Sequence, residues 1–257
     1  MNGEMYQICR ITAAAKNALK TGASIQYEPL PYEKCIGFQF LPEKKLFGTK
    51  QVKAKGVEEW YVHCCKKGMR DIKMMLPIQV KDRNVLGFSN TSQSALVCFW
   101  GNSQVSLFFP RWEFDSAQKG WDIRYTEQVC KDLSGMKFHF GDNTEDFKAI
   151  LEKIGRFARE IDCGNFADIF ETSLSYLQGV SLPEHRPGQI PLPQIPESHL
   201  PLFQAASRAD VFGAMGSWND SPPYMAHEKG MDEEYGTLSD GLLRQLRLAV
   251  LYAVNGW

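Results

Sequence analysis

Two apolar runs within residues 94–109 place the strongest constraint on what this chain can fold into. The first reads A-L-V-C-F-W and the second V-S-L-F-F, and G-N-S-Q lies between them. A Gly-Asn pair suits a tight hairpin turn, because glycine adopts a positive φ without a Cβ clash. Both alternating sets of side chains in the first run are apolar, so we expect a central strand that is covered on both faces.

The rest of the N-terminal half predicts further strands and two short helices. A period-two alternation around Ile36, Phe38 and Phe40 is typical of a strand. Apolar stripes at helical spacing predict a helix that ends at Gly22 and a second that ends at Gly68. These two helices are expected over residues 4–19 and 57–67, and the strands over 32–41, 71–78, 121–125 and 137–140, with a turn at 135–136.

The C-terminal half has a helical character instead. Asp142 and Glu145 form a capping-box pattern ahead of an apolar stripe. Six prolines between residues 182 and 201 predict an extended connector, because proline fixes φ and favours a polyproline-like path. Helical periodicity is found over residues 147–161, 166–177, 197–207 and 238–253.

Together these patterns predict an α+β fold rather than an alternating β-α-β one. We expect a β-rich N-terminal half with a mainly antiparallel sheet and short helices, followed by a mainly helical C-terminal half. The boundary is expected near residue 142, which gives regions 1–142 and 143–257. Whether these regions are separate or form one compact domain is left open.

Composition excludes several classes of protein. The chain is 44% hydrophobic and 23% charged, as in ordinary globular proteins. No apolar run approaches the roughly 18 residues of a membrane helix, so no membrane partner is expected. The first residues, M-N-G-E-M-Y-Q-I-C-R, lack the apolar region of a secretory signal. Seven scattered cysteines, an odd number, indicate reduced thiols, and a cytoplasmic location is expected.

The net charge of −1 hides an asymmetry along the chain. Residues 1–70 carry 12 Lys and Arg against 6 Asp and Glu, whereas residues 161–257 carry 5 against 12. An acidic half can face a basic protein partner, although solvated surface charge is the plainer interpretation. The basic segment has no nucleic-acid motif and no interleaved aromatic residues, so no nucleic-acid partner is expected. The sequence carries no signal for an oligomeric state.

Strong catalytic and cofactor motifs are absent from the chain. It contains no P-loop, no G-x-G-x-x-G, no H-E-x-x-H, no paired C-x-x-C and no G-x-S-x-G. No cofactor and no metal is therefore expected. Missing motifs make catalysis less expected without deciding whether the protein is an enzyme.

Residues 210–223, D-V-F-G-A-M-G-S-W-N-D-S-P-P, have the composition of a shaped loop. Its glycines would let main chain approach a ligand, and Trp218 could form an apolar wall beside it. The candidate binding residues are Asp210, Phe212, Trp218 and Asp220. A carboxylate and an imidazole suffice for acid–base chemistry if they share a cleft, so Asp220 and His227 are the catalytic candidates. The structural alternative is a turn whose aromatic residues plug the core.

Two other clusters are weaker candidates for a catalytic or binding site. His63 stands next to Cys64 and Cys65, a set that could bind zinc or form a nucleophile and its base. Adjacent cysteines on one helix point apart and are poor co-ligands, whereas nearby lysines would favour a thiolate. A buried cysteine beside an outward histidine is the simpler interpretation. Aromatic residues and carboxylates also gather at Trp112, Glu113, Asp115, Trp121 and Asp122. Such a set could form a platform for a sugar or a cation, a glycosidase pair, or only a hairpin edge.

The segment V-F-G-A-M-G-S-W-N-D, with the acidic stretch and helix that follow it to residue 255, resembles the tail of bacterial proteins of unknown function. Some proteins with such a tail accompany toxin–immunity loci. The resemblance covers about a quarter of the chain and implies an immunity-like binding role without catalytic residues. The N-terminal half has no such resemblance.

Two hypotheses about function follow. The first is a cytoplasmic bacterial protein that binds a protein partner by stoichiometric contact, and interfaces favour aromatic residues of the kind in the 210–223 loop. The alternative is a small-molecule hydrolase that uses Asp220 and His227 beside Trp218. A scaffold or phage-derived protein without a small ligand is a third possibility.

Overall fold

The first helix packs along the sheet and is almost entirely buried. A computed structural model describes residues 1–45, 48–130, 138–180 and 190–257. Helix α1 (Gly3–Thr21) begins where the Asn2 side chain accepts a hydrogen bond from the Met5 N–H. It ends where Gly22 adopts a left-handed φ of 70°, the conformation that glycine takes most readily. Both the helix and its predicted stop are confirmed.

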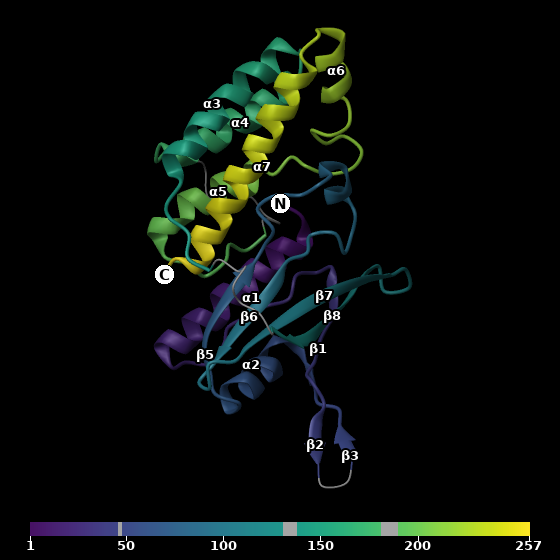
Figure 1. Ribbon diagram of the computed structural model, residues 1–257, viewed down its shortest axis with the longest axis vertical. Helices are drawn as coiled ribbons and strands as arrows, with labels where there is room; N and C mark the ends of the chain where they lie inside the picture. Colours follow the sequence, from purple (N-terminus) through teal and green to yellow (C-terminus); the bar gives the residue numbers. More distant parts are fainter. Residues whose placement is uncertain (46–47, 131–137, 181–189) are drawn as a thin grey trace.

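Six strands form one mixed sheet in the order β4-β1-β8-β7-β6-β5. All neighbouring pairs are antiparallel except β1 with β8, so the expectation of a mainly antiparallel sheet is confirmed. The strands are β1 (Glu33–Gln39), β4 (Lys53–Lys55), β5 (Met69–Met75), β6 (Ala95–Trp100), β7 (Val105–Asp115) and β8 (Gly120–Val129). Two further strands, β2 (Glu43–Lys45) and β3 (Gly48–Lys50), form a separate hairpin that projects from the body (Figure 1).

The sheet has one large core face and one smaller buried area on the other face. Helices α1 and α2 (Gly56–Lys66) cover the first face, where Phe38, Phe108 and Tyr125 are buried. Val97, Val105 and Leu107 form a separate buried cluster on the second face. Strand β6 pairs with both β5 and β7 and is buried on both sides, as its doubly apolar pattern predicts.

The predicted strand at 137–140 is wrong in its described part. Residues 138–140 have no strand conformation, while residue 137 and the predicted turn at 135–136 lie outside the described residues. The Phe138 ring instead packs edge-on against Phe99, with ring centroids 5.2 Å apart. This short segment therefore covers the second face of the sheet, because its aromatic side chain contributes more by burial there than by pairing at an edge.

The C-terminal half is helical, as expected, and the fold is α+β. Its helices are α3 (Thr144–Glu160), α4 (Gly164–Leu177), α5 (Leu200–Ala209), α6 (Pro222–Glu228) and α7 (Asp232–Asn255). Helix α3 begins where the sequence predicts it, but the predicted capping box of Asp142 and Glu145 is wrong, because the N-cap residue is Asn143 and its side chain makes no capping hydrogen bond. Asp142 instead accepts hydrogen bonds from the N–H and hydroxyl of Thr144, the first residue of the helix. Residues 190–196 of the proline-rich connector are irregular and lead into η2 (Glu197–His199), while 182–189 lie outside the described residues.

Helix α7 joins the two halves (Figure 1). It packs against α3, α5 and β5, and its last residue, Asn255, exchanges two hydrogen bonds with the backbone of Met74 in the sheet. The Lys16 ammonium of α1 donates to the Asn255 carbonyl oxygen, 2.9 Å away. In the described part of the chain, no helix has both the length and the apolar character required to cross a membrane.

Candidate functional site

The 210–223 loop is anchored in the core by Trp218. This side chain is fully buried, and Phe157, Phe166 and Phe170 surround it edge-on at ring-centroid distances of 6.4, 5.2 and 5.4 Å. Its indole N–H donates to the Ser239 hydroxyl over 2.8 Å. Tyr235 of α7 stacks on the same ring at a centroid distance of 5.7 Å. The expectation that Trp218 forms a wall for a ligand is therefore wrong, because side chains of α3, α4 and α7 bury its ring.

The other binding candidates of this loop also serve its own structure. Phe212 is buried in the core. One carboxylate oxygen of Asp210 lies 3.8 Å from the α-amino nitrogen of Met1. Asp220 accepts a hydrogen bond from the Gly216 N–H over 2.7 Å, which closes the loop on itself. None of these contacts leaves a side chain of the loop poised over a cleft.

The close approach at this loop depends on Gly87 of the neighbouring segment, and it is an approach of main chain to main chain rather than to a ligand. A Cβ atom on Gly87 would lie 2.3 Å from the Ala214 nitrogen and 2.5 Å from the Gly213 carbonyl carbon. The Asn219 amide adds a hydrogen bond to the Arg83 carbonyl oxygen over 2.9 Å. The loop thus supports the short 3-10 helix η1 (Arg83–Gly87), which leads directly into Phe88.

The catalytic candidates do not meet in a cleft. His227 is exposed and its Nδ1 lies 3.1 Å from a carboxylate oxygen of Asp232, while Asp220 bonds within its own loop. Neither side chain lines any of the larger cavities that the described residues form. The alternative of a hydrolase that uses these two residues gains no support from their placement.

His63, Cys64 and Cys65 do not form a nucleophile and base either. Cys64 is buried, and burial raises the pKa of its thiol, which is the opposite of what a thiolate nucleophile requires. The His63 ring packs on Phe40 with centroids 4.1 Å apart, and burial lowers the pKa of its imidazole. The simpler interpretation, a cysteine in the core, applies to Cys64, whereas Cys65 is exposed.

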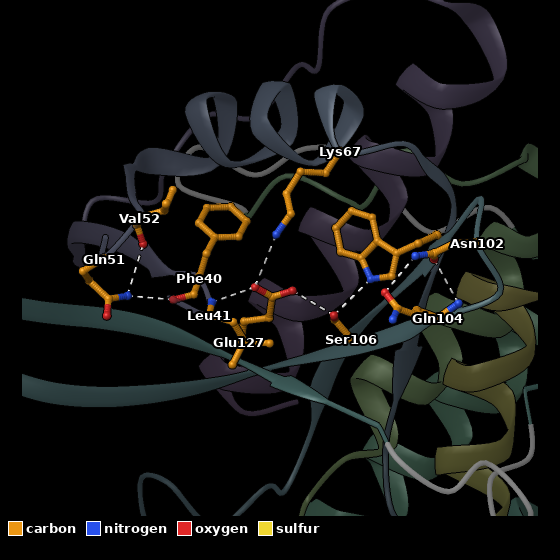
Figure 2. A network of polar contacts seen from close by, with 10 residues as sticks. Phe40, Leu41, Gln51, Val52, Lys67, Asn102, Gln104, Ser106 and Glu127 are labelled. Atoms are coloured by element: carbon orange, nitrogen blue, oxygen red, sulfur yellow. Dashed lines mark hydrogen bonds and ion pairs between the residues drawn. The ribbon is translucent and has the colours of Figure 1, made fainter. Parts of the chain in front are cut away.

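A buried polar network lies next to this cluster and is centred on Glu127 (Figure 2). One carboxylate oxygen accepts the Leu41 N–H over 2.9 Å and lies 3.9 Å from the Lys67 ammonium. The other accepts the Ser106 hydroxyl over 2.8 Å, and that hydroxyl in turn accepts the Trp100 indole N–H over 3.0 Å. None of the five residues lines a larger cavity of the described chain, so this network holds strands together.

The aromatic residues of the third cluster do line a cavity. Trp112 and Trp121 contact each other at a ring-centroid distance of 5.8 Å, and Phe114 lies 5.3 Å from Trp121. Their carboxylate neighbours lie elsewhere, since successive side chains of a strand point to opposite faces. Glu113 is exposed and pairs with Arg111, and it stands across from Asp122 on the opposite face. The expected joint platform of aromatic rings and these acids is therefore not formed.

We call the cavity over these tryptophans the aromatic cleft. It has a volume of about 650 Å³. The start of α1, the segment after η1 and strands β7 and β8 form its walls. Its aromatic lining consists of Tyr6, Tyr32, Phe88, Trp112 and Trp121. Volume and lining are typical of a ligand or side-chain binding site.

Glu4 lies between the aromatic cleft and a neighbouring cavity of about 690 Å³, and it lines both. The neighbouring cavity is bordered by Ser92, Ser94, Phe109 and Phe140, among others. Among the described residues that line the two cavities, Glu4 is the one charged side chain. Burial raises the pKa of both Tyr6 and Tyr32 to about 12, so these hydroxyls stay neutral near pH 7.

Two exposed phenylalanines lie in the lining of the aromatic cleft or next to it. Phe88 lines it and is 63% exposed, and Phe114, which contacts Trp121, is 59% exposed. Sequence reasoning finds Trp112 and Trp121 but misses Glu4, Tyr6, Tyr32 and Phe88. These four come from three distant segments, so no local pattern links them to the tryptophans.

Comparison with protein-family models, with curated proteins and with solved structures found no match to this chain. Among the described residues, no group of three or more His, Cys, Asp or Glu side chains is placed to hold a metal ion. The chemistry of the site is therefore argued from its own residues, which can bind through aromatic surface and one carboxylate.

Proposed function

We propose that the protein acts by stoichiometric contact with a partner protein, and that the aromatic cleft is its contact site. The observation that carries this proposal is the exposure of two neighbouring rings, Phe88, which lines the cleft, and Phe114, which contacts the lining residue Trp121. Exposed apolar side chains that gather around a pocket typically mark an interaction site, and interfaces are enriched in aromatic residues. The contact site thus differs from the 210–223 loop, whose backbone packs against Gly87 of η1.

In this proposal the protein is cytoplasmic and immunity-like, and its partner is basic. Four buried cysteines, Cys9, Cys64, Cys98 and Cys163, are free thiols, which fits a reducing compartment. The excess of acidic residues in 161–257 favours a basic partner by long-range attraction. The resemblance of residues 211–255 to the tails of proteins that accompany toxin–immunity loci suggests a toxin as that partner.

Partner capture with matched surface variants tests the proposal. Phe88→Ser and Tyr224→Ser each remove one exposed aromatic ring, with exposures of 63% and 62%, but Tyr224 lies on α6 and does not line the cleft. The tagged wild type and both variants would be incubated with extract of the source organism and the retained proteins quantified by mass spectrometry. We expect one protein to be retained by the wild type and by Tyr224→Ser.

Phe88→Ser should lower the retention of that protein at least tenfold, because hot-spot aromatic residues contribute about 2 kcal/mol or more to an interface. Purified partner then gives the stoichiometry by light scattering, for which we expect one to one. Equal retention by Phe88→Ser and the wild type contradicts the assignment of the contact site to the cleft.

A further inference from the structure

The carboxylate of Glu4 is buried without a positive partner. Its side chain belongs to a residue that is 6% exposed, and its Oε1 accepts a hydrogen bond from the Asn90 N–H. Within the described part of the chain no lysine, arginine or histidine forms an ion pair with it. Met1 also lines the cleft, but its α-amino group is buried and paired with Asp210.

A buried carboxylate normally has a cation beside it, because removal of a charge from water costs several kcal/mol unless a partner compensates. The backbone donor at Asn90 and the first turn of α1 compensate part of this cost. The other side of Glu4 faces two cavities whose remaining lining is neutral. A positively charged group in the cleft would complete the compensation.

We propose that the aromatic cleft receives an arginine side chain of the partner protein, whose guanidinium pairs with Glu4 and stacks on the tryptophan rings. This inference rests on the proposed function and names the chemistry of the partner. Guanidinium is planar, is less strongly hydrated than ammonium and stacks on aromatic faces while it binds a carboxylate. The rings of Trp112 and Trp121 and the carboxylate line one cavity, which supplies both contacts.

The surroundings of the cleft favour a side chain of a protein over a free small cation. Phe88 and Phe114 extend the apolar surface beyond the cavity opening. A free cation inside the cavity would leave both rings in water, whereas a protein backbone that presents an arginine would cover them.

The first test uses blocked amino acids as probes of the cleft. Nα-acetyl-arginine methylamide, its lysine counterpart and its neutral citrulline counterpart would be titrated into the full chain by isothermal calorimetry and by NMR. We expect the arginine probe to bind with a dissociation constant of about 1 mM, since one side chain buries little surface. The lysine probe should bind several-fold more weakly and the citrulline probe at least tenfold more weakly.

The second test changes the protein. Glu4→Gln keeps the acceptor for the Asn90 N–H but removes the charge, so it should weaken the arginine probe about tenfold. Glu113→Gln is the matched control, because Glu113 is exposed on the other face of the sheet, and it should leave the affinity unchanged. Circular dichroism and the urea midpoint check that Glu4→Gln folds. The comparison of arginine with citrulline on the wild type needs no variant.

Equal affinity for arginine and citrulline, or unchanged binding by a folded Glu4→Gln, overturns this inference. Equal affinity for lysine overturns the preference for guanidinium. Absence of arginine binding, together with retention of a partner that depends on Phe88, overturns the arginine inference but leaves the proposed function standing. Loss of that dependence on Phe88 removes the proposed function itself, so the two failures are distinguishable.

Discussion

At the scale of single residues, Glu127 shows what a fully satisfied buried carboxylate looks like. It accepts hydrogen bonds from Leu41 and Ser106 and has Lys67 as its cation. Glu4 is equally buried but has one neutral donor and no cation among the described residues. The contrast separates a carboxylate that stabilises the fold from one that is available to a ligand.

We expect Glu127→Ala to destabilise the protein by about 2 kcal/mol, since it leaves the Ser106 hydroxyl and the Leu41 N–H without their acceptor. Urea unfolding measures the change in the free energy of unfolding. Glu113→Ala is the control on the neighbouring strand, and its exposed pair with Arg111 should contribute less than about 1 kcal/mol. Similar losses in the free energy of unfolding for the two variants would mean that the network around Glu127 does not stabilise the fold.

The sequence predicts some site residues and not others, for a physical reason. Trp112 and Trp121 are close along one hairpin, so a local pattern brings them together. Trp218 is enclosed by rings from two helices about 50 residues earlier in the chain, and nothing within its own loop signals that enclosure. A Gly- and Pro-rich segment with an aromatic residue has the same composition whether the ring faces solvent or the core.

At the scale of elements, two loops that are far apart in the sequence determine the shape of the aromatic cleft. The 210–223 loop packs backbone to backbone on Gly87, and the residue after Gly87 is Phe88 at the opening. The loop thus helps to position η1 and, through it, the Phe88 side chain in the cleft. This explains why the loop matters to the site although its candidate binding residues do not line the cleft.

We expect Gly87→Ala to destabilise the protein by about 1–3 kcal/mol, because the new methyl group would overlap the backbone of Ala214. Thermal unfolding measures the loss, and binding of the partner should weaken with it as Phe88 shifts. Gly236→Ala is the control, because its position on α7 has open space for a methyl group and the change there should be neutral or stabilising by up to about 1 kcal/mol. An unchanged melting temperature for Gly87→Ala would contradict the close packing of the two loops.

Most elements could be predicted from local signals, and the exceptions are instructive. The hairpin of β6 and β7 and the stop at Gly22 each depend on a few adjacent residues. The failure at residues 138–140 has a non-local cause, since Phe138 finds a partner in Phe99 across the sheet. The parallel pairing of β1 with β8, which are about 90 residues apart, likewise has no signal in either strand.

At the scale of the whole molecule, the sheet half and the helical half share one buried core. A single cluster of buried residues runs from α1 and the sheet into α3, α4, α5 and α7. Asn255 connects the halves through its two hydrogen bonds to Met74 and its contact with Lys16. Because the two halves bury surface against each other, we expect them to unfold together in one cooperative transition.

We expect urea unfolding to give coincident transitions by helical circular dichroism and by tryptophan fluorescence. Four of the six tryptophans lie in residues 1–142, so fluorescence reports mainly on the sheet half. Asn255→Ala should shift both transitions together and lower the free energy of unfolding by about 2 kcal/mol, as it leaves buried backbone groups of Met74 unpaired. Two separate transitions in the wild type would instead indicate independent domains divided near residue 142.

The central claim is that the opening of the aromatic cleft touches another protein. Photo-crosslinking inside living cells tests it most directly, with benzoyl-phenylalanine placed at Phe88 and, as control, at Tyr224, which is equally exposed on α6. The account predicts one discrete crosslinked protein from position 88, lost when Glu4→Gln is added, and no such product from position 224. The same products from both positions, or none from position 88, would contradict it.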